Sequence, residues 1–379
     1  MTYRFPTQSN LYRGESEPVK RPKEFACFSY DEQHQYHIGD RSMKWYYTPA
    51  LGADLSQGYE DFIKHDDSID EHLDSLLTTI VHHEKETKKP IDANIVTWRG
   101  MMTKIMAVPF DNRDGFEMNA TLYRGAIFIE ENNEYKKASK EAQQNWRSAI
   151  PQDVMQYWGY KFETLSTIPR PWGETSRDYI ENRDSHVTNN KEQYCSVVRT
   201  GIGKSIICIG GEVDAIWDSK PNPTYVELKT SANPTSGRDE ENFHRKLMKW
   251  WIQSFLLGVP KIIVGFRSPD GILTKVEEIK TMTIPHMVKS MGKAHWDGDV
   301  CINFAGAFLE WLRQTITTEG VWRIRSAPKS NFIEVFQVEQ VGHGNIITDE
   351  FMNWRIQLSL ADATTSVNAE RTPGVLEGG

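Results

Sequence analysis

The sequence predicts an α+β fold, with one large domain over residues 1–356 and a disordered polar tail over 357–379. Three observations predict it. Segments with helical and with strand-like patterning follow one another along the chain. No internal repeat and no linker rich in proline, glycine or serine separates them, and the C-terminal residues are too polar to build a core. A chain of 379 residues, 39% hydrophobic and 25% charged, has the composition of a globular protein with one large core or two smaller ones.

Helical and strand patterns alternate in the first third of the chain. Residues 70–84 are predicted to form an amphipathic helix, because apolar side chains recur there every three or four positions. A second helix is predicted over 94–108. A strand pair is predicted over 118–131, turning near Arg124 and Gly125.

The middle of the chain combines one helix with consecutive strands. Residues 150–167 carry an apolar stripe and predict a helix, with Pro151 in its first turn and Glu163 near its end. Residues 194–218 and 224–231 then predict three strands in sequence, whose neighbours are most simply antiparallel.

The C-terminal part repeats these two patterns. Helices are predicted over 239–258, where a glycine follows the last turn, and over 303–316. A hairpin is predicted over 261–280, and two alternating strands over 321–325 and 332–339.

The composition limits the class of protein. No apolar run is long enough to span a membrane, and the first residues lack the apolar stretch of a secretory signal. The cysteines, with no CxxC pair and no Cys/His set at zinc spacing, are expected to be reduced core residues of an intracellular protein: Cys27, Cys195, Cys208 and Cys301. A net charge of -8 argues against a protein that coats nucleic acid through bulk charge, but it permits a basic pocket for one phosphorylated end.

Residues 210–231 combine strand patterns with charges that a buried strand rarely carries. Glu212 and Asp214 stand two positions apart in the first strand, and Glu227 and Lys229 do so in the second. Because side chains alternate between the faces of a strand, each pair shares a face. If the hairpin aligns these faces, carboxylates about 4 Å apart repel by roughly 4 kcal/mol at an effective dielectric near 20. Such a cluster of oxygens favours Mg²⁺ or Mn²⁺ over zinc.

A simpler explanation places these charges on a solvated strand face, with the apolar residues between them inside. The spacing across both strands favours the metal site. An acid, twelve intervening residues and then Glu-x-Lys is typical of restriction-nuclease-like, PD-(D/E)xK-type metal sites.

Three further residues are candidates for the same site, each with a plainer alternative. Arg99 is either a partly buried ion-pair partner or a planar fork for a phosphate. Glu163 is either a solvated helix residue or a metal ligand. Gln253, among tryptophans on a predicted helix, has a structural amide as its plainer role.

These residues, taken together, resemble the DXO-type family of RNA 5′-end decapping and quality-control hydrolases, and most closely its fungal nuclear branch. The motifs that carry the resemblance follow in family order: TWRG with Arg99, GYKFE with Glu163, GEVDA with Glu212 and Asp214, ELKTS with Glu227 and Lys229, and KWWIQSFLLG with Gln253. Similarity extends from RPKEFACFSYD near the start to FMNWR near the end, so it covers nearly the whole chain.

The resemblance implies two packed mixed β-sheets with flanking helices around a nuclease-like core. It implies that Glu163, Asp214, Glu227 and the backbone carbonyl of Leu228 bind a divalent cation, Mg or Mn.

The resemblance also implies catalytic and substrate-binding roles. Glu212 would act on the attacking water or bind a second ion. Lys229 and Gln253 would lie against the scissile phosphate and the nucleophile, and Arg99 against phosphates of the RNA end.

The implied activity is metal-assisted hydrolysis at RNA 5′ ends. Depending on the family member, it removes pyrophosphate from a triphosphate end, an incompletely methylated cap or an NAD-type cap, with exonuclease activity as a further possibility. The implied partner is the nuclear 5′-to-3′ exoribonuclease, which the protein would stabilise, and the implied location is the nucleus. No membrane and no DNA partner are expected. Two alternatives stay open: a non-catalytic subunit that stabilises the exoribonuclease, and a restriction-type DNA nuclease.

Overall fold

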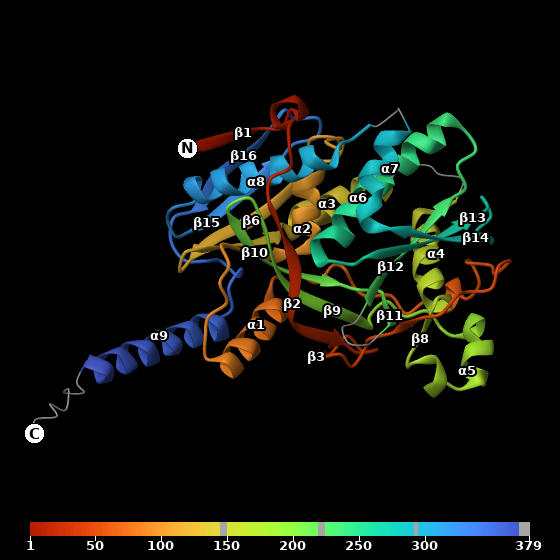
Figure 1. Ribbon diagram of the computed structural model, residues 1–379, viewed down its shortest axis with the longest axis horizontal. Coiled ribbons are helices and arrows are strands. Elements are labelled where there is room, and N and C mark those ends of the chain that lie inside the picture. Colours follow the sequence, from red (N-terminus) through yellow and green to blue (C-terminus); the bar gives the residue numbers. More distant parts are fainter. Residues whose placement is uncertain (145–149, 219–223, 292–294, 371–379) are drawn as a thin grey trace, which may run out of the picture.

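Two mixed β-sheets with helices packed against them form the protein (Figure 1). The computed structural model describes residues 1–144, 150–218, 224–291 and 295–370. Within these residues, the larger sheet has ten strands in the order β1 (Thr2–Pro6), β16 (Phe332–Glu339), β15 (Val321–Ser326), β6 (Phe116–Tyr123), β7 (Ala126–Glu131), β5 (Ile95–Trp98), β10 (Ser205–Glu212), β9 (Gln193–Ile202), β2 (Val19–Tyr30) and β3 (Tyr36–Ile38). The described strands of the smaller sheet are six, in the order β14 (Leu273–Lys280), β13 (Lys261–Arg267), β12 (Thr224–Ala232), β11 (Ala215–Asp218), β4 (Trp45–Tyr46) and β8 (Thr167–Ile168).

The described α-helices lie on both sides of these sheets. They are α1 (Asp74–Thr87), α2 (Arg99–Ala107), α3 (Asn133–Gln144), α4 (Gln152–Leu165), α5 (Arg177–Glu181), α6 (Gly237–Leu257), α7 (Ile284–Ser290), α8 (Gly298–Thr315) and α9 (Asp349–Glu370). Short 3-10 turns occupy Ser9–Tyr12, Tyr59–Asp61, Trp172–Glu174, Arg183–Ser185 and Thr281–Thr283. None of the described helices combines the length and the apolar character that crossing a bilayer requires.

Three hydrophobic clusters hold these layers together. Helices α1 and α9 cover one face of the large sheet, where Leu76 and Phe351 are fully buried. Helices α2, α6 and α8 share a core with both sheets, including Ile209 of the large sheet and Ile262 of the small one. Helix α4 packs on the small sheet through Phe162 and its neighbours. The small sheet is therefore covered on both faces, which explains why its strands carry so few exposed apolar residues.

Most predicted elements are present. Helices α1, α4, α6 and α8 lie where the helical spacing places them, and the predicted hairpins appear as the antiparallel pairs β6–β7 and β13–β14. Arg124 and Gly125 both have positive φ, as a tight hairpin turn requires. Of the cysteines, three are buried and Cys27 is half-buried, and all four are free, as predicted.

The predicted helix over 94–108 is wrong in its first third. Residues Ile95–Trp98 form β5, which pairs in parallel with β7 and β10, and helix α2 begins only at Arg99. The run IVTW is apolar and rich in β-branched residues, so local periodicity does not separate a buried strand from a buried helix.

The region over 194–231 contains four described strands in two sheets where three consecutive strands were predicted. β9 and β10 pair in the large sheet, and β11 and β12 pair in the small one, antiparallel in both cases. The turn predicted within 219–223 lies outside the described residues.

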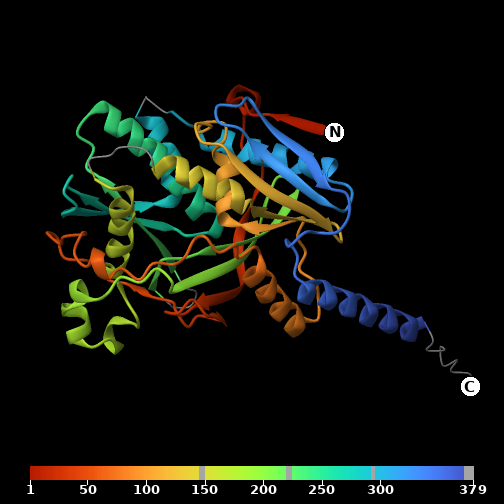
Figure 2. The ribbon, with the colours of Figure 1, turned by 180° about the vertical axis from the view of Figure 1, so that it is seen from behind.

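The predicted disordered tail needs a correction up to residue 370. Helix α9 runs from Asp349 to Glu370, and it projects away from the body in both views (Figures 1 and 2). Its distal residues contain no glycine or proline, so helix can continue beyond the part that packs on α1. The predicted tail residues 371–379 lie outside the described residues.

Candidate active site

The four charged residues of the GEVDA and ELKTS motifs meet where the chain passes from the large sheet to the small one. Glu212 is the last residue of β10, and Asp214 lies in the two-residue gap before β11 begins at Ala215. The hairpin predicted over 210–231 required both residues to lie on one continuous strand, and they do not. The break places each acid at the seam between the two sheets.

Glu227 and Lys229 lie on β12, in the interior of the small sheet. Val226 and Leu228 point to the side where α4 packs, and the alternate residues point to the core around α2 and α6. Glu227 is 0% exposed. The explanation that placed these charges on a solvated face is therefore wrong for this strand.

A compact set of ion pairs surrounds Glu227. Nη1 of Arg99 lies 3.1 Å from its Oε2, and Nζ of Lys229 lies 2.7 Å from its Oε1. The same ammonium is 3.9 Å from Oδ2 of Asp214, which accepts a hydrogen bond of 2.6 Å from the amide of Leu228. Arg99 is thus an ion-pair partner here. Within the described part of the chain its hydrogen bonds to side chains use Nη1, and Nε and Nη2 remain for another acceptor.

Gly211 makes room for Arg99. A Cβ atom at position 211 would lie 2.9 Å from Cβ of Arg99 and 2.9 Å from Cδ1 of Leu257. Such contacts are shorter than side chains tolerate, so a larger residue would push the N-terminus of α2 away from β10. Glycine at this position lets the guanidinium reach Glu227.

Glu163 reaches the site from α4. Gly265 of β13 allows the close packing of α4, because a Cβ there would lie 2.5 Å from Cε2 of Phe162. Glu163 lines a small cavity of about 40 Å³ together with Glu212, Asp214, Lys44 and Tyr160. The helix predicted from periodicity therefore delivers its acid to the same place as the strands.

The acids influence one another strongly. Burial raises the pKa of Glu163 well above its ordinary value, with a further increase from Asp214 and Glu212. Burial also raises the pKa of Glu212, and it raises that of Asp214 to about 7, where Glu227 adds to the effect. Glu227 differs: burial alone raises its pKa, but Arg99 and Lys229 outweigh burial and leave the pKa below its ordinary value.

Lys229 remains a cation. Burial lowers the pKa of its ammonium, but Glu227 and Asp214 more than compensate, and the resulting pKa is above the ordinary value. Lys229 is thus a fixed positive charge rather than a base.

The residues fit a divalent cation held by oxygen atoms. Burial raises the pKa values of three carboxyl groups, and nearby cations do not match all of their charge, so a divalent cation among them would supply the missing positive charge. The four acids are Glu163, Glu212, Asp214 and Glu227. Among the described residues, no three of them each bring a carboxylate oxygen within 4.8 Å of the carboxylate oxygens of the other two. Glu227 is turned toward Arg99 and Lys229, and Asp214 toward the Leu228 amide, so three-fold ligation requires side-chain rotation.

Gln253 is half-buried on α6 and has no hydrogen bond to the acids among the described residues, so its role stays a prediction. The same holds for the carbonyl of Leu228. The sequence gives no spacing signal for Lys44 and Tyr160, which reach the cavity from a loop and from α4.

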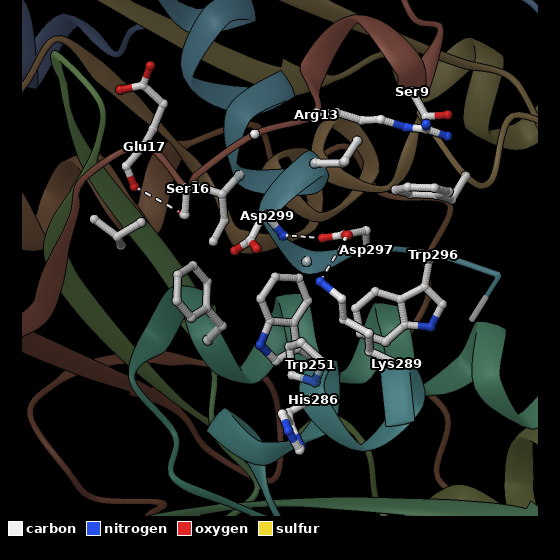
Figure 3. A pocket seen from close by; sticks show the side chains of 18 of the residues that line it. Ser9, Arg13, Ser16, Glu17, Trp251, His286, Lys289, Trp296, Asp297 and Asp299 are labelled. Carbon is white, nitrogen blue, oxygen red and sulfur yellow. Dashed lines mark hydrogen bonds and ion pairs between the residues drawn. The ribbon is translucent and has the colours of Figure 1, made fainter. Parts of the chain in front are cut away.

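A much larger cavity lies elsewhere. Its volume is about 920 Å³, and Trp251, Trp296 and Lys289 are among the side chains that line it (Figure 3). None of the predicted site residues lines this cavity. The size of a cavity therefore does not identify the candidate active site, which is the small cavity lined by the acids.

An Asp just before one strand and a Glu-x-Lys on the strand paired with it, with a further acid from a packed helix, define a nuclease of the PD-(D/E)XK type. Residues 20–352 match the family of RAI1-like PD-(D/E)XK nucleases. The chain belongs to this family, and it is an enzyme.

Relatives of known name cover almost the whole chain. The decapping nuclease RAI1 of Neurospora crassa is 69% identical over 369 residues, which is 96% of this chain and 90% of that protein. The decapping nuclease RAI1 of Gibberella zeae is 61% identical over 376 residues, 97% of this chain and 100% of that protein.

Solved structures agree with the fold. Candida albicans Rai1 in complex with pU5 and Mn²⁺ has a TM-score of 0.86 and 32% identity, covering 94% of this chain and 100% of that one. Scheffersomyces stipitis Rai1 with (3′-NADP)⁺ and calcium has a TM-score of 0.85 and 30% identity, covering 93% and 100%. The predicted architecture of two mixed sheets with flanking helices is confirmed, and use of divalent metal is a property of these relatives.

Proposed function

We propose that this protein is a divalent-metal-dependent hydrolase of RNA 5′ ends that uses Mg²⁺ or Mn²⁺. The observation that carries the proposal is the buried arrangement of Asp214, Glu227 and Lys229 beside Glu163 at the seam of the two sheets. Its substrates would be triphosphate ends, incompletely methylated caps and NAD-type caps. Support comes from the names of the relatives as decapping nucleases and from the nucleotides bound to similar structures.

Four groups would hold the metal ion: Glu163, Asp214, Glu227 and the carbonyl of Leu228. A divalent cation at such a site stabilises negative charge on phosphate oxygens and lowers the pKa of water. Glu212, at the end of β10, would complete the site by accepting the proton that the attacking water loses.

The cationic side chains would orient the substrate. Lys229 stays protonated and would meet the negative charge that develops on the phosphate, and Gln253 would bind the same region as a neutral donor. Arg99, held by Glu227 through Nη1, would offer its remaining N–H groups to a phosphate of the RNA end. In the reaction, the water oxygen bonds to phosphorus and the bridging P–O bond breaks.

The test compares RNAs that differ only at their 5′ ends. The purified full chain is incubated with triphosphate, NAD-capped, unmethylated-cap and monophosphate RNAs in Mg²⁺ or Mn²⁺, and products are separated and weighed by mass spectrometry. Release of pyrophosphate or of the intact cap is expected, and Asp214→Asn should abolish it. Glu310→Gln, which changes an exposed acid paired with Lys204, is the matched control and should be active.

Two other results would point to the alternatives. A folded wild-type protein with no turnover on any of these RNAs would favour the non-catalytic subunit. Cleavage of duplex DNA at a rate equal to that on RNA would favour a restriction-type nuclease.

A second part of the proposal concerns partner and location. The family resemblance implies that the protein binds and stabilises a 5′-to-3′ exoribonuclease in the nucleus. Co-sedimentation with the purified exoribonuclease of the same organism tests the partner, and imaging of a tagged chain tests the location. Separate sedimentation of the two proteins at micromolar concentration would refute the partnership.

A further inference from the structure

A second set of ligand-type side chains lies apart from the acids, on loops beside the large sheet. His34 is in the turn between β2 and β3, and His65 and Glu71 are in the loop that precedes α1. One ligand atom from each lies within 4.8 Å of the other two, and this is the only such set of histidine, cysteine or acidic residues among those described. The three residues are 31 and 6 positions apart in the sequence, so only folding assembles them.

The imidazole of His34 is oriented by the backbone. Its Nδ1 lies 2.8 Å from the carbonyl oxygen of Lys191. Because a carbonyl only accepts hydrogen bonds, Nδ1 carries the proton, and Nε2 is the atom that faces the cluster. A backbone carbonyl on the far ring nitrogen is the usual support of a metal-binding histidine.

Nε2 of His34 faces a carboxylate. It lies 2.7 Å from Oε1 of Glu71, and Nε2 of His65 lies 3.8 Å from the same oxygen. In the neutral imidazole, Nε2 and the carboxylate oxygen are both acceptors, so this contact requires a proton or a metal ion between them. Two ligand atoms that each lie about 2.0 Å from a tetrahedral zinc ion are about 3.3 Å apart. This separation lies between the distances of 2.7 Å and 3.8 Å from the two imidazole nitrogens to the Glu71 oxygen.

The surroundings leave room for a further ligand. The side chains of His34 and His65 are each 14% exposed, and Glu71 is 40% exposed. His65 and Glu71 line a neighbouring cavity of about 240 Å³. Water can therefore take a fourth position.

We propose that His34, His65 and Glu71 form a binding site for a Zn²⁺-class transition-metal ion, with water as the fourth ligand. Two imidazoles and one carboxylate are the donors that such ions prefer, whereas Mg²⁺ prefers oxygen alone. The site is separate in residues and in donor type from the all-oxygen site of Glu163, Asp214 and Glu227.

A metal ion bound at this site would stabilise one side of the cavity that Glu163 lines. The amide of His65 donates a hydrogen bond of 2.6 Å to Asn190, and Ile63 forms a β-bridge with Asn189. Asn189 and Asn190 line the cavity that holds Glu163. An ion at the cluster would therefore hold the loop before α1 and the segment before β9 together, and it is expected to raise the melting temperature.

The experiment measures binding of Zn²⁺ to the metal-stripped full chain by competition with a chromophoric chelator. It uses an Asp214→Asn, Glu227→Gln background, so that the acid site does not contribute. One Zn²⁺ per chain is expected. Adding His65→Ala or His34→Asn should weaken the affinity at least tenfold. Asparagine suits position 34 because φ there is 66°.

The control and the overturning results are equally direct. His82→Ala, which changes an exposed histidine of α1, should bind as the background does. Absence of Zn²⁺ binding to a folded background protein would overturn the proposal, and so would equal affinity in a folded His65→Ala variant. Binding is read without any RNA, so failure here leaves the proposed hydrolase activity untouched.

Discussion

The acid site and the His34–His65–Glu71 cluster hold their charges in opposite ways. The acid site gathers four carboxylates on β10, β12, α4 and the gap before β11, and Glu227 among them is fully buried. The histidine cluster lies on loops, and its single carboxylate is partly exposed to water. Three of the four acids have raised pKa values, because burial withdraws their charge from water and the two nearby cations do not compensate for all of it.

This difference shows what rigid elements allow. Strands and a packed helix can hold like charges together, because the free energy of the surrounding core opposes their separation. A loop is packed less tightly and resists such repulsion less well. A cluster on loops is therefore better built from side chains that can be neutral, such as histidine. Changes to the acid site should therefore alter both stability and activity, and changes to the histidine cluster should have small effects unless metal is present.

The largest effect is expected from Glu227→Ala. The change leaves the guanidinium of Arg99 and the ammonium of Lys229, both mostly buried, without their shared carboxylate, which costs about 3–5 kcal/mol of unfolding free energy. Loss of a metal ligand should also lower kcat/KM by about 10³-fold. Urea unfolding and decapping kinetics measure the two effects. Glu310→Ala, at an exposed pair, should change neither, and a Glu227→Ala protein as stable as the wild type would contradict the buried ion-pair set.

Gly211→Ala should have the next largest effect. The added methyl group would meet Arg99 and Leu257 at 2.9 Å, so Arg99 must move relative to Glu227. We expect a loss of about 1–3 kcal/mol from overpacking and a fall in kcat/KM of about 10²-fold from misplacement of the guanidinium.

Gly159→Ala is the matched control for this variant. Gly159 lies within α4, and a Cβ there meets nothing within 4 Å, so alanine should stabilise the helix by about 0.5–1 kcal/mol. Equal effects of the two alanines would show that Gly211 is not needed for the approach of α2.

The pH dependence of the metal-free protein separates the two regions further. The pKa of Asp214 in the folded protein, about 7, is above its unfolded value near 3.9, so folding is favoured while Asp214 is protonated. That stability is lost as the pH rises through 7. The melting temperature should fall by on the order of 5 °C between pH 5.5 and 8, and added Mn²⁺ should reverse the fall.

Asp214→Asn should remove the part of this pH dependence that comes from Asp214, because asparagine does not titrate, whereas Glu163 and Glu212 still do. Calorimetry of both proteins at several pH values measures it. The opposite result would be a wild-type melting temperature that rises relative to that of the variant between pH 5.5 and 8. It would show that folding does not raise the pKa of Asp214.

The smallest effect is expected from Glu71→Gln without metal. Glu71 is partly exposed, and its contacts with His34 and His65 are those of a surface ion pair, so the loss should be below about 1 kcal/mol. In the presence of Zn²⁺ the wild type should gain stability that the variant does not. If Glu71→Gln without metal lowered the unfolding free energy by several kcal/mol, the cluster would contribute as much to stability as the acid site, which contradicts the comparison.

The sequence alone determined much of this protein. Apolar residues at helical spacing predicted α1, α4, α6 and α8, because each buries one stripe against a sheet, and this periodicity is local. The order of the motifs from Arg99 to Gln253, through the family resemblance, selected the residues predicted for the site, and a polar residue in an apolar segment is visible without a structure. The role of Gln253 stays a prediction.

Only the tertiary structure decided how these parts meet. It separated Glu212 from Asp214 at the seam of two sheets, converted residues 95–98 into a strand, and joined His34 to Glu71 across the loop before α1. The reason is physical: periodicity reports which side of a segment is buried, and it does not report which partner buries it. Strand pairing and loop contacts depend on residues far apart in the chain, and those contacts exist only after folding.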